Sequence, residues 1–217
     1  MRPITVTVGP LAAASANAIC LSQTPAGAGA LTLNGALVTG GVAILDTARR
    51  VLITCAANET GDTFTITGTG VTGQTQSETI AGPNATTAQS VLDYKTVTSI
   101  TISAAAAGAI TIGTSGVASS QWVRLDGWAL PQTSIQCTAS GTVNYTVQQT
   151  LDDPDSPTNP VPAALTTWVN HPDINLVSAT TTVQGNYGYV PMFARVTLNS
   201  GTGTVTATFL QSGVNPA

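Results

Sequence analysis

The sequence predicts an all-β protein made of two β-sandwich or barrel-like lobes with an extended N-terminal arm. In short runs, apolar residues alternate with Thr or Ser, a pattern typical of half-buried strands. The runs end at turn signals such as Asn34-Gly35 and Asn199-Ser200-Gly201. No stretch shows convincing helical periodicity. Short strands spaced about eight to twelve residues apart are typical of sandwiches and barrels.

The expected elements follow in chain order. Residues 1–30 form an arm or lead-in strand in which Ile4, Val6 and Val8 alternate with polar residues, a pattern that fits a strand better than a signal peptide. Residues 31–118 form a Thr/Gly-rich β domain, and residues 119–217 form a C-terminal β-sandwich domain. The alanine run 104–107 is expected to be a loop, because strands flank it and Gly108 ends it. The alternating apolar positions, each pair or triplet pointing one way, are Phe64, Ile66, Ile100, Ile102, Ile110, Ile112, Val123, Leu125, Ile135, Cys137, Val143, Tyr145, Val147, Val196, Leu198, Val205, Ala207 and Phe209.

The composition favours a protein that functions in contact with neighbours. The 217 residues are 42% hydrophobic, which is enough for a core, but only 7% charged, and 38 are Thr. A surface of hydroxyls loses less free energy than a charged one when another protein covers it. A secreted β protein would show the same bias. The net charge of −4 and the six scattered basic residues argue against nucleic-acid binding, and no apolar run approaches the length of a membrane span.

Catalytic residues are not expected. The single histidine, His171, lies two residues before Asp173, and such a pair could form an oriented base. No nucleophile elbow accompanies it, so a turn residue or a ring packed on an aromatic is the favoured interpretation. The three cysteines form no metal or redox motif and are expected to be buried free thiols, consistent with assembly in a reducing cytoplasm. No cofactor is expected.

Three carboxylates crowd one loop and form a weak calcium candidate: Asp152, Asp153 and Asp155. Prolines interrupt their spacing, and the EF-hand pattern is absent, so no metal site is expected. The loop itself, Leu151–Ala164, should be stiff and extended because it holds four prolines. Loops of this length in a compact domain are usually functional or docked. The loop prolines expected to lie at an interaction surface are Pro154, Pro157 and Pro160.

Further candidate interaction residues are aromatic or basic. Tyr187 and Tyr189 would lie on the same face of a strand and, with Trp122 and Trp128, could bind a glycan. Core packing of these rings is the favoured alternative, because aromatic residues make up only 5% of the chain. The basic pair Arg49-Arg50, at a strand start, indicates a solvated edge or an inter-subunit pair.

Several segments resemble modules of tailed-bacteriophage structural proteins. In the first half they are the run R-x-V-x-I-T that ends at Thr54, followed by Asn58–Gly70, Ser77–Ala85 and Lys95–Thr101. In the second half the segments GTVNYTVQQTLDDP, TTWVNHPD and FARVTLNSGTGTVTATFLQ are similar to phage virion and prophage proteins. Together these segments cover most of the chain.

The resemblance implies a virion component without catalytic residues. The function expected first is a capsid decoration (cement) protein that stabilises the head by binding the capsid lattice as a homo-oligomer, with a trimer favoured. Its partners would be the major capsid protein or other virion proteins, and it would be assembled into the virion in the bacterial cytoplasm. One alternative is a neck or tail component, such as a tube or baseplate protein. A second alternative is a receptor- or glycan-binding virion module.

Overall fold

The computed structural model describes residues 3–125 and 132–211, and it confirms the all-β prediction. Two short 3-10 turns, η1 (Ala163–Leu165) and η2 (Ile174–Leu176), are the helical segments of this part of the chain. The strands are β1 (Ile4–Val8), β2 (Ser15–Gln23), β3 (Gly29–Ala30), β4 (Val38–Thr39), β5 (Val42–Cys55), β6 (Thr63–Thr69), β7 (Thr75–Ala81), β8 (Thr87–Ile102), β9 (Ile110–Ser119), β10 (Val123–Arg124), β11 (Thr133–Ser140), β12 (Val143–Thr150), β13 (Val169–Asn170), β14 (Val183–Tyr187), β15 (Phe193–Gly201) and β16 (Thr204–Gln211).

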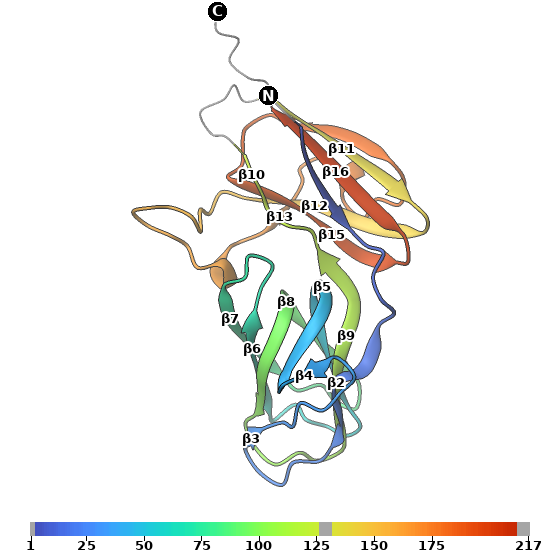
Figure 1. Cartoon of the computed structure of the whole chain (residues 1–217), viewed down its shortest axis with the longest axis vertical. Helices are drawn as coiled ribbons and strands as arrows, with labels where there is room; N and C mark the ends of the chain where they lie inside the picture. The colour runs from blue at the N-terminus through green and yellow to red at the C-terminus, as the bar shows by residue number, and fades with distance from the viewer. Residues whose placement is uncertain (1–2, 126–131, 212–217) are drawn as a thin grey trace, which may run out of the picture. The chain divides into compact units, whose positions relative to one another are not determined.

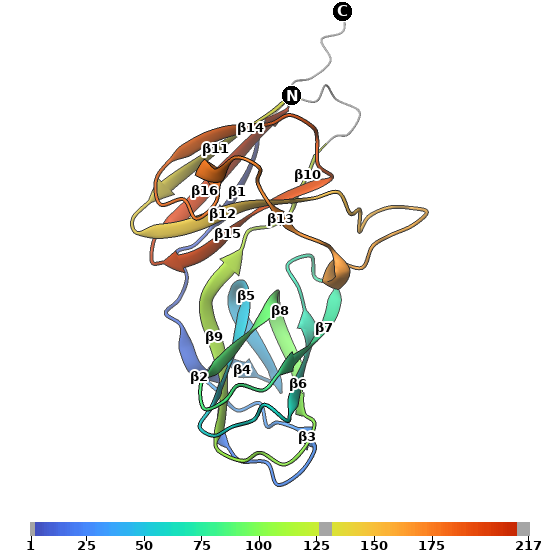
Figure 2. The ribbon, with the colours of Figure 1, turned by 180° about the vertical axis from the view of Figure 1, so that it is seen from behind.

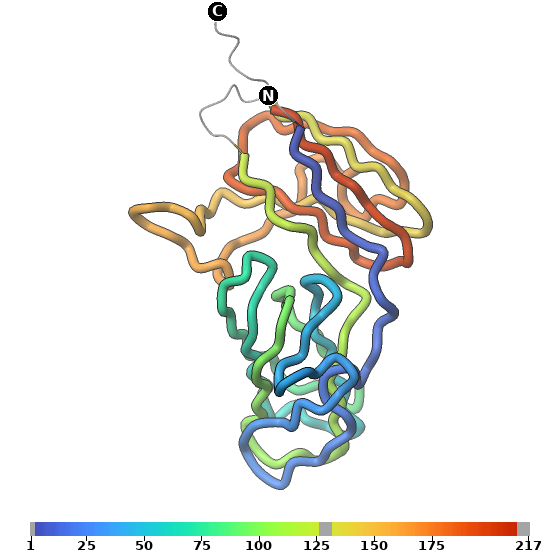
Figure 3. The backbone as a smooth tube through the Cα atoms, viewed as in Figure 1, coloured from blue at the N-terminus to red at the C-terminus, as the bar shows by residue number. Residues whose placement is uncertain are grey.

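The chain divides into two compact units, one of which is inserted into the sequence of the other. The first unit consists of Met1–Leu11 and Val117–Ala217, and the second of Ala12–Gly116. The second unit is therefore an insertion that follows β1, as the path of the tube in Figure 3 shows. Of the expected arm, residues 4–8 form a strand of the first unit, whereas residues 15–23 form a strand of the second.

The first unit is a β-sandwich. One sheet has the order β1-β16-β11-β14, with every neighbouring pair antiparallel (Figure 1). Strands β13, β12 and β15 form the opposing layer, to which β10 and the end of β9 add; Figure 2 shows β11, β12 and β14 from behind. Both layers contribute buried side chains to one core, among them Phe209, Ile135, Tyr145 and Val196.

The second unit is a sheet folded around its own core. Strands β7, β6, β8, β5 and β9 are neighbours in that order, and β2, β3 and β4 attach to β9, β8 and β5. The inward positions of β5, β6, β8 and β9 fill the core, with Phe64, Ile66, Tyr94 and Ile100 fully buried. Gly113 is required where β2 crosses β9, because a Cβ atom there would lie 1.7 Å from the carbonyl oxygen of Ser15.

The alternation expected from the sequence is confirmed residue by residue. Every one of the eighteen alternating apolar positions named above is buried, with at most 4% of its surface exposed. Residues 104–107 form a loop, as predicted. Alternate side chains of a strand point to opposite faces, so the threonines between these positions point away from the apolar ones; most are half-buried, whereas Thr146 and Thr197 are buried as well. The fold thus follows from burial of the apolar face of each strand, and β12 and β15 are buried on both faces.

Candidate functional site

The first unit presents a sheet without a single charged residue. Strands β1, β16, β11 and β14 consist entirely of uncharged residues, and we call them the charge-free sheet. Its inward face belongs to the sandwich core. The register of the four strands aligns the outward residues in rows, which are Thr5, Thr208, Gln136 and Gln184 in one row and Thr7, Thr206 and Thr138 in the next.

Hydrogen bonds link these rows across the strands. The hydroxyls of Thr7 and Thr206 are 3.1 Å apart, and the side-chain amide of Gln184 donates to that of Gln136 at 3.1 Å. Such cross-strand pairs each contribute about 0.2–1 kcal/mol and keep the face ordered. Beside them lies a hollow of about 290 Å³. The outward side chains that line it are those of Pro3, Ser134, Gln136, Gln184, Thr208 and Leu210.

The second unit carries a second uncharged face. Three strands place nine hydroxyl residues in three rows, which we call the hydroxyl grid. The hydroxyls of Thr65 and Thr79 are 3.0 Å apart, and those of Thr69 and Thr96 are 2.7 Å apart. All nine residues are exposed or half-buried. The rows are Thr79, Thr65 and Thr101; Ser77, Thr67 and Ser99; and Thr75, Thr69 and Thr96.

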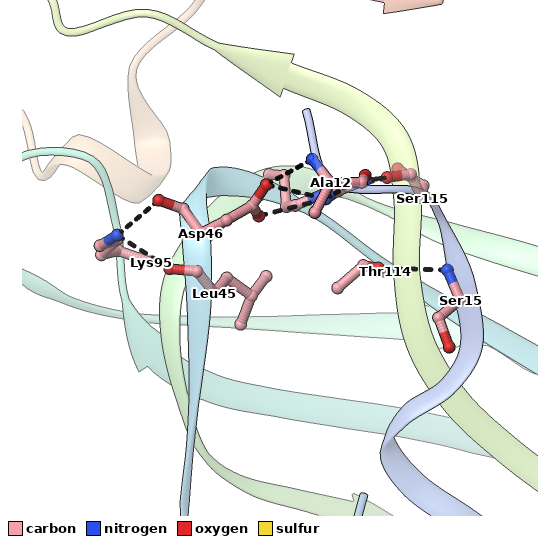
Figure 4. Close-up of polar contacts among 8 residues, drawn as sticks. Ala12, Ser15, Leu45, Asp46, Lys95, Thr114 and Ser115 are labelled. Carbon is pink, nitrogen blue, oxygen red and sulfur yellow. Dashed lines mark hydrogen bonds and ion pairs between the residues drawn. The ribbon is translucent and has the colours of Figure 1, made fainter. Parts of the chain in front are cut away.

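A buried arginine organises the second unit close to both of its chain ends. Arg49 is 1% exposed, so it does not lie on a solvated edge, and that expectation is wrong. Its guanidinium donates to the carbonyl oxygens of Ala12 (3.0 Å) and Ser115 and to the carboxylate of Asp46 (3.1 Å). Figure 4 shows these partners converging from three segments of the chain. Because buried charge requires hydrogen-bonding partners, this site fixes the backbone where the chain enters and leaves the unit.

Asp46 is held as an anion at this site. Burial acts to raise its pKa, but the Ala12 N–H group and the Arg49 guanidinium together lower the pKa below its ordinary value. Lys95 holds the same stretch of β5 by donating to the carbonyl oxygens of Leu45 (2.8 Å) and Asp46 (3.0 Å; Figure 4). A hollow of about 230 Å³ adjoins the pair, lined by four alanines and Leu37 and by the polar residues Ser15 and Thr114. The charged groups of Arg49 and Asp46 both form hydrogen bonds with main-chain groups, so we assign this pair a structural role.

The single histidine, which the sequence offered as a possible base, is buried. His171 is 3% exposed, and its Nδ1 atom accepts a hydrogen bond from the Asp173 N–H group at 3.0 Å. Burial lowers its pKa, and the nearby Asp173 carboxylate offsets this only in part. The His171 ring packs 4.5 Å from that of Tyr187, which confirms the packed-ring interpretation.

The three cysteines are buried free thiols, as predicted. Burial raises the pKa of Cys20 to about 12, that of Cys55 to about 11 and that of Cys137 to about 12. Since the thiolate is the nucleophilic form, these thiols are held unreactive at neutral pH.

The proline-rich loop after β12 is tied down at its acidic start. Arg124 pairs with Asp153 at 3.1 Å and with Asp155 at 3.5 Å. The carboxylate of Asp152 instead accepts from the Thr167 N–H group at 2.7 Å. Within residues 3–125 and 132–211, no group of three or more His, Cys, Asp or Glu side chains is placed to hold a metal ion. Of the loop prolines, Pro154 is half-buried, whereas Pro157 and Pro160 are exposed.

The aromatic residues considered for glycan binding differ in exposure, although the rings of Tyr187 and Tyr189 lie 6.4 Å apart. Tyr187 is 1% exposed and belongs to the core, whereas Tyr189 is 47% exposed. Trp122 packs edge-on against Trp168, with ring centroids 5.0 Å apart, and Trp128 lies outside the described residues. The rings therefore do not form one exposed platform among the described residues.

The remaining candidate interaction residues lie on strands. Ile4, Val6 and Val8 run from 40% exposed through half-buried to fully buried along β1. Arg50 is half-buried.

Comparison with known proteins adds no relatives: no family model matches the chain, and no curated protein matches it. In the described part of the chain, no helix has the length and apolar character needed to cross a membrane.

Sequence reasoning missed the Arg49 site, although a signal was present. Along β5, Arg49 has the same parity as the buried residues Leu45, Val51 and Ile53. Period-two alternation alone therefore places its side chain inward. The partner carboxylate of Asp46 lies three residues earlier.

Proposed function

We propose that this protein is a non-enzymatic structural protein of a tailed-bacteriophage virion, and specifically a decoration protein that binds the capsid lattice as a homo-oligomer. The observation that carries the proposal is the pair of uncharged polar faces, the charge-free sheet and the hydroxyl grid. The phage-like segments of the sequence support the same assignment.

Uncharged hydroxyl faces suit broad contact with another protein. A hydroxyl both donates and accepts hydrogen bonds, so it can satisfy a partner of either kind. Covering it costs less than covering a charge. A standard interface buries roughly 800 Å² on each partner, and several such contacts per oligomer multiply the effective affinity. Because few charges take part, the attachment depends little on salt.

The use of reactive side chains also supports a structural role. The buried thiols are held protonated, the histidine is packed against a tyrosine, and the Arg49–Asp46 pair binds main-chain groups. Catalysis needs several such groups to converge on open space. Here the thiols and the histidine are buried, and the ion pair binds main-chain groups.

The test begins with purified particles of the phage or prophage that carries the gene. We expect quantitative mass analysis to find the protein on the heads in a number of copies that scales with the capsid lattice. A single ring of copies would instead assign it to the neck or tail. Absence from purified particles would refute the virion proposal altogether.

A binding assay then locates the contact. Heads that lack the protein are mixed with the recombinant full chain, and bound protein is measured by co-sedimentation. Thr67→Glu places a charge at the centre of the hydroxyl grid and should weaken binding at least tenfold. Thr87→Glu, at an exposed position of β8 outside the grid, is the matched control and should bind as the unmodified protein does. Equal binding by both variants would exclude the grid as a contact.

A further inference from the structure

One edge of the charge-free sheet is formed by a strand that has neither a charge nor a bulge. Strand β1 ends the sheet, and its five residues pair with β16 without a register shift. Its sequence ITVTV contains no charge, glycine or proline. Soluble proteins usually block such edges with charges, prolines, bulges or a covering segment, because a bare edge can pair with another strand.

Two other edge strands of the described residues are held by neighbouring segments. At β7, Glu78 accepts hydrogen bonds from the N–H groups of Val91 (2.8 Å) and Leu92 (3.0 Å), which ties this edge to the first half of β8. At β14, which runs without interruption from Val183 to Tyr187, the side chain of Leu176 from η2 packs against Gly185.

We propose that β1 pairs with β1 of a second copy of this chain, in antiparallel orientation about a two-fold axis, so that two charge-free sheets become one continuous sheet. Each copy carries a net charge of −4, so two copies approach most easily where neither has a carboxylate. The four strands of this sheet have none.

The register of this pairing follows from the alternation of β1. Residues directly opposite one another in an antiparallel pair point to the same side of the sheet, so threonines must face threonines. The register that pairs all five residues sets Val6 opposite Val6 of the second copy and Thr5 opposite Thr7. The hydroxyl rows then continue across the junction. On the inward side, Ile4, which is 40% exposed, and the half-buried Val6 become covered.

Cysteine cross-linking tests the register directly. Val6→Cys places a thiol at the two-fold axis, and mild oxidation should give a disulfide-linked dimer on a non-reducing gel. Thr5→Cys and Thr7→Cys, each alone, should cross-link at least tenfold less, because each residue faces the other one in the partner. The unmodified chain, with its three buried thiols, is the background control. A folded Val6→Cys protein that stays monomeric, or equal cross-linking of all three variants, would overturn the proposal.

A second measurement does not depend on disulfide formation. Sedimentation velocity should show that the unmodified chain forms dimers in a concentration-dependent manner. Thr5→Lys/Thr7→Lys sets lysines opposite lysines at the junction and should weaken dimerisation at least tenfold. Thr206→Lys/Thr208→Lys puts the same charges on the neighbouring strand and should have a smaller effect. A monomeric unmodified chain, or unchanged dimerisation of the β1 variant, would contradict the pairing. These outcomes are independent of whether the protein is found on phage particles.

Discussion

Replacing Arg49 with methionine should selectively destabilise the second unit. The change removes the guanidinium from a site where Arg49 is 1% exposed, together with the hydrogen bonds it donates to the Ala12 and Ser115 carbonyl oxygens and to the Asp46 carboxylate. Hydrogen bonds to charged groups are worth about 1.5–3 kcal/mol each, and removing one partner of a buried ion pair costs about 3–5 kcal/mol. Because the Asp46 side chain is 32% exposed and water can reach it, we expect a loss of about 3 kcal/mol in the free energy of unfolding.

The assay combines urea unfolding, followed by circular dichroism, with hydrogen exchange measured on peptides. Exchange should accelerate in peptides that cover β5 and the part of β9 before Val117, and not in β11 or β16. Arg50→Met is the matched control, since Arg50 is half-buried and its Nε atom makes no hydrogen bond; it should cost less than about 1 kcal/mol. A loss below about 0.5 kcal/mol for the Arg49 variant would refute the structural role assigned to this site.

The same site predicts an acid-sensitive contribution to stability. The pKa of Asp46 is lower in the folded chain than in the unfolded one. Its contribution is therefore complete above the unfolded value of about 3.9 and is lost as the pH falls through the folded value. Asp46→Asn should remove this part of the pH dependence, as measured by unfolding between about pH 2 and 5. An unchanged acid profile in the variant would contradict the assignment.

Three further predictions concern the cores. Gly113→Ala should lower the free energy of unfolding by about 1–3 kcal/mol, because its Cβ would meet the Ser15 backbone. Gly116→Ala, on the same strand, has open space around its Cβ and should leave the free energy of unfolding unchanged. Urea unfolding of both variants compares the two. Because the pKa of His171 is lowered in the folded chain, its contribution to the free energy of unfolding is complete above about pH 6.5 and is lost as the pH falls below that value. His171→Gln should therefore make the free energy of unfolding less dependent on pH in this window. The three thiols should resist alkylation at pH 8 in the folded protein and all react in denaturant, as counted by mass spectrometry; alkylation of the folded chain would contradict their burial.

Much of the fold was predictable because it depends on local patterns. Alternation identified inward residues such as Phe64, Ile135 and Phe209 correctly, since burying one face of a strand is a local requirement. Strand partners were not predictable in the same way. Ile4 pairs with Phe209, and nothing in a run of alternating residues specifies a partner some 200 positions away. Pairing over such distances is decided by packing of the whole unit.

The candidate surfaces likewise combine features that local sequence predicts with features that only the tertiary fold creates. The sequence indicated uncharged, threonine-rich strands, but the rows of the hydroxyl grid depend on the register between β6, β7 and β8. The burial of Arg49 depends on carbonyl oxygens contributed by Ala12 and Ser115, which lie 37 and 66 residues away. A buried charge is stabilised by partners that come from the tertiary fold, so the residue type alone suggested a surface position.

The insertion of the second unit after β1 has a consequence for synthesis of the chain. The ribosome produces β1 first, and β16, its partner, only about 200 residues later. The second unit, Ala12–Gly116, is synthesised long before that and can fold while β1 still lacks its partner strand. By bringing Ala12 and Ser115 together through Arg49, the folded insertion shortens the effective loop that β1 must close. Slow translation or early release of the chain would therefore delay or prevent folding of the first unit, whereas the second unit would still fold.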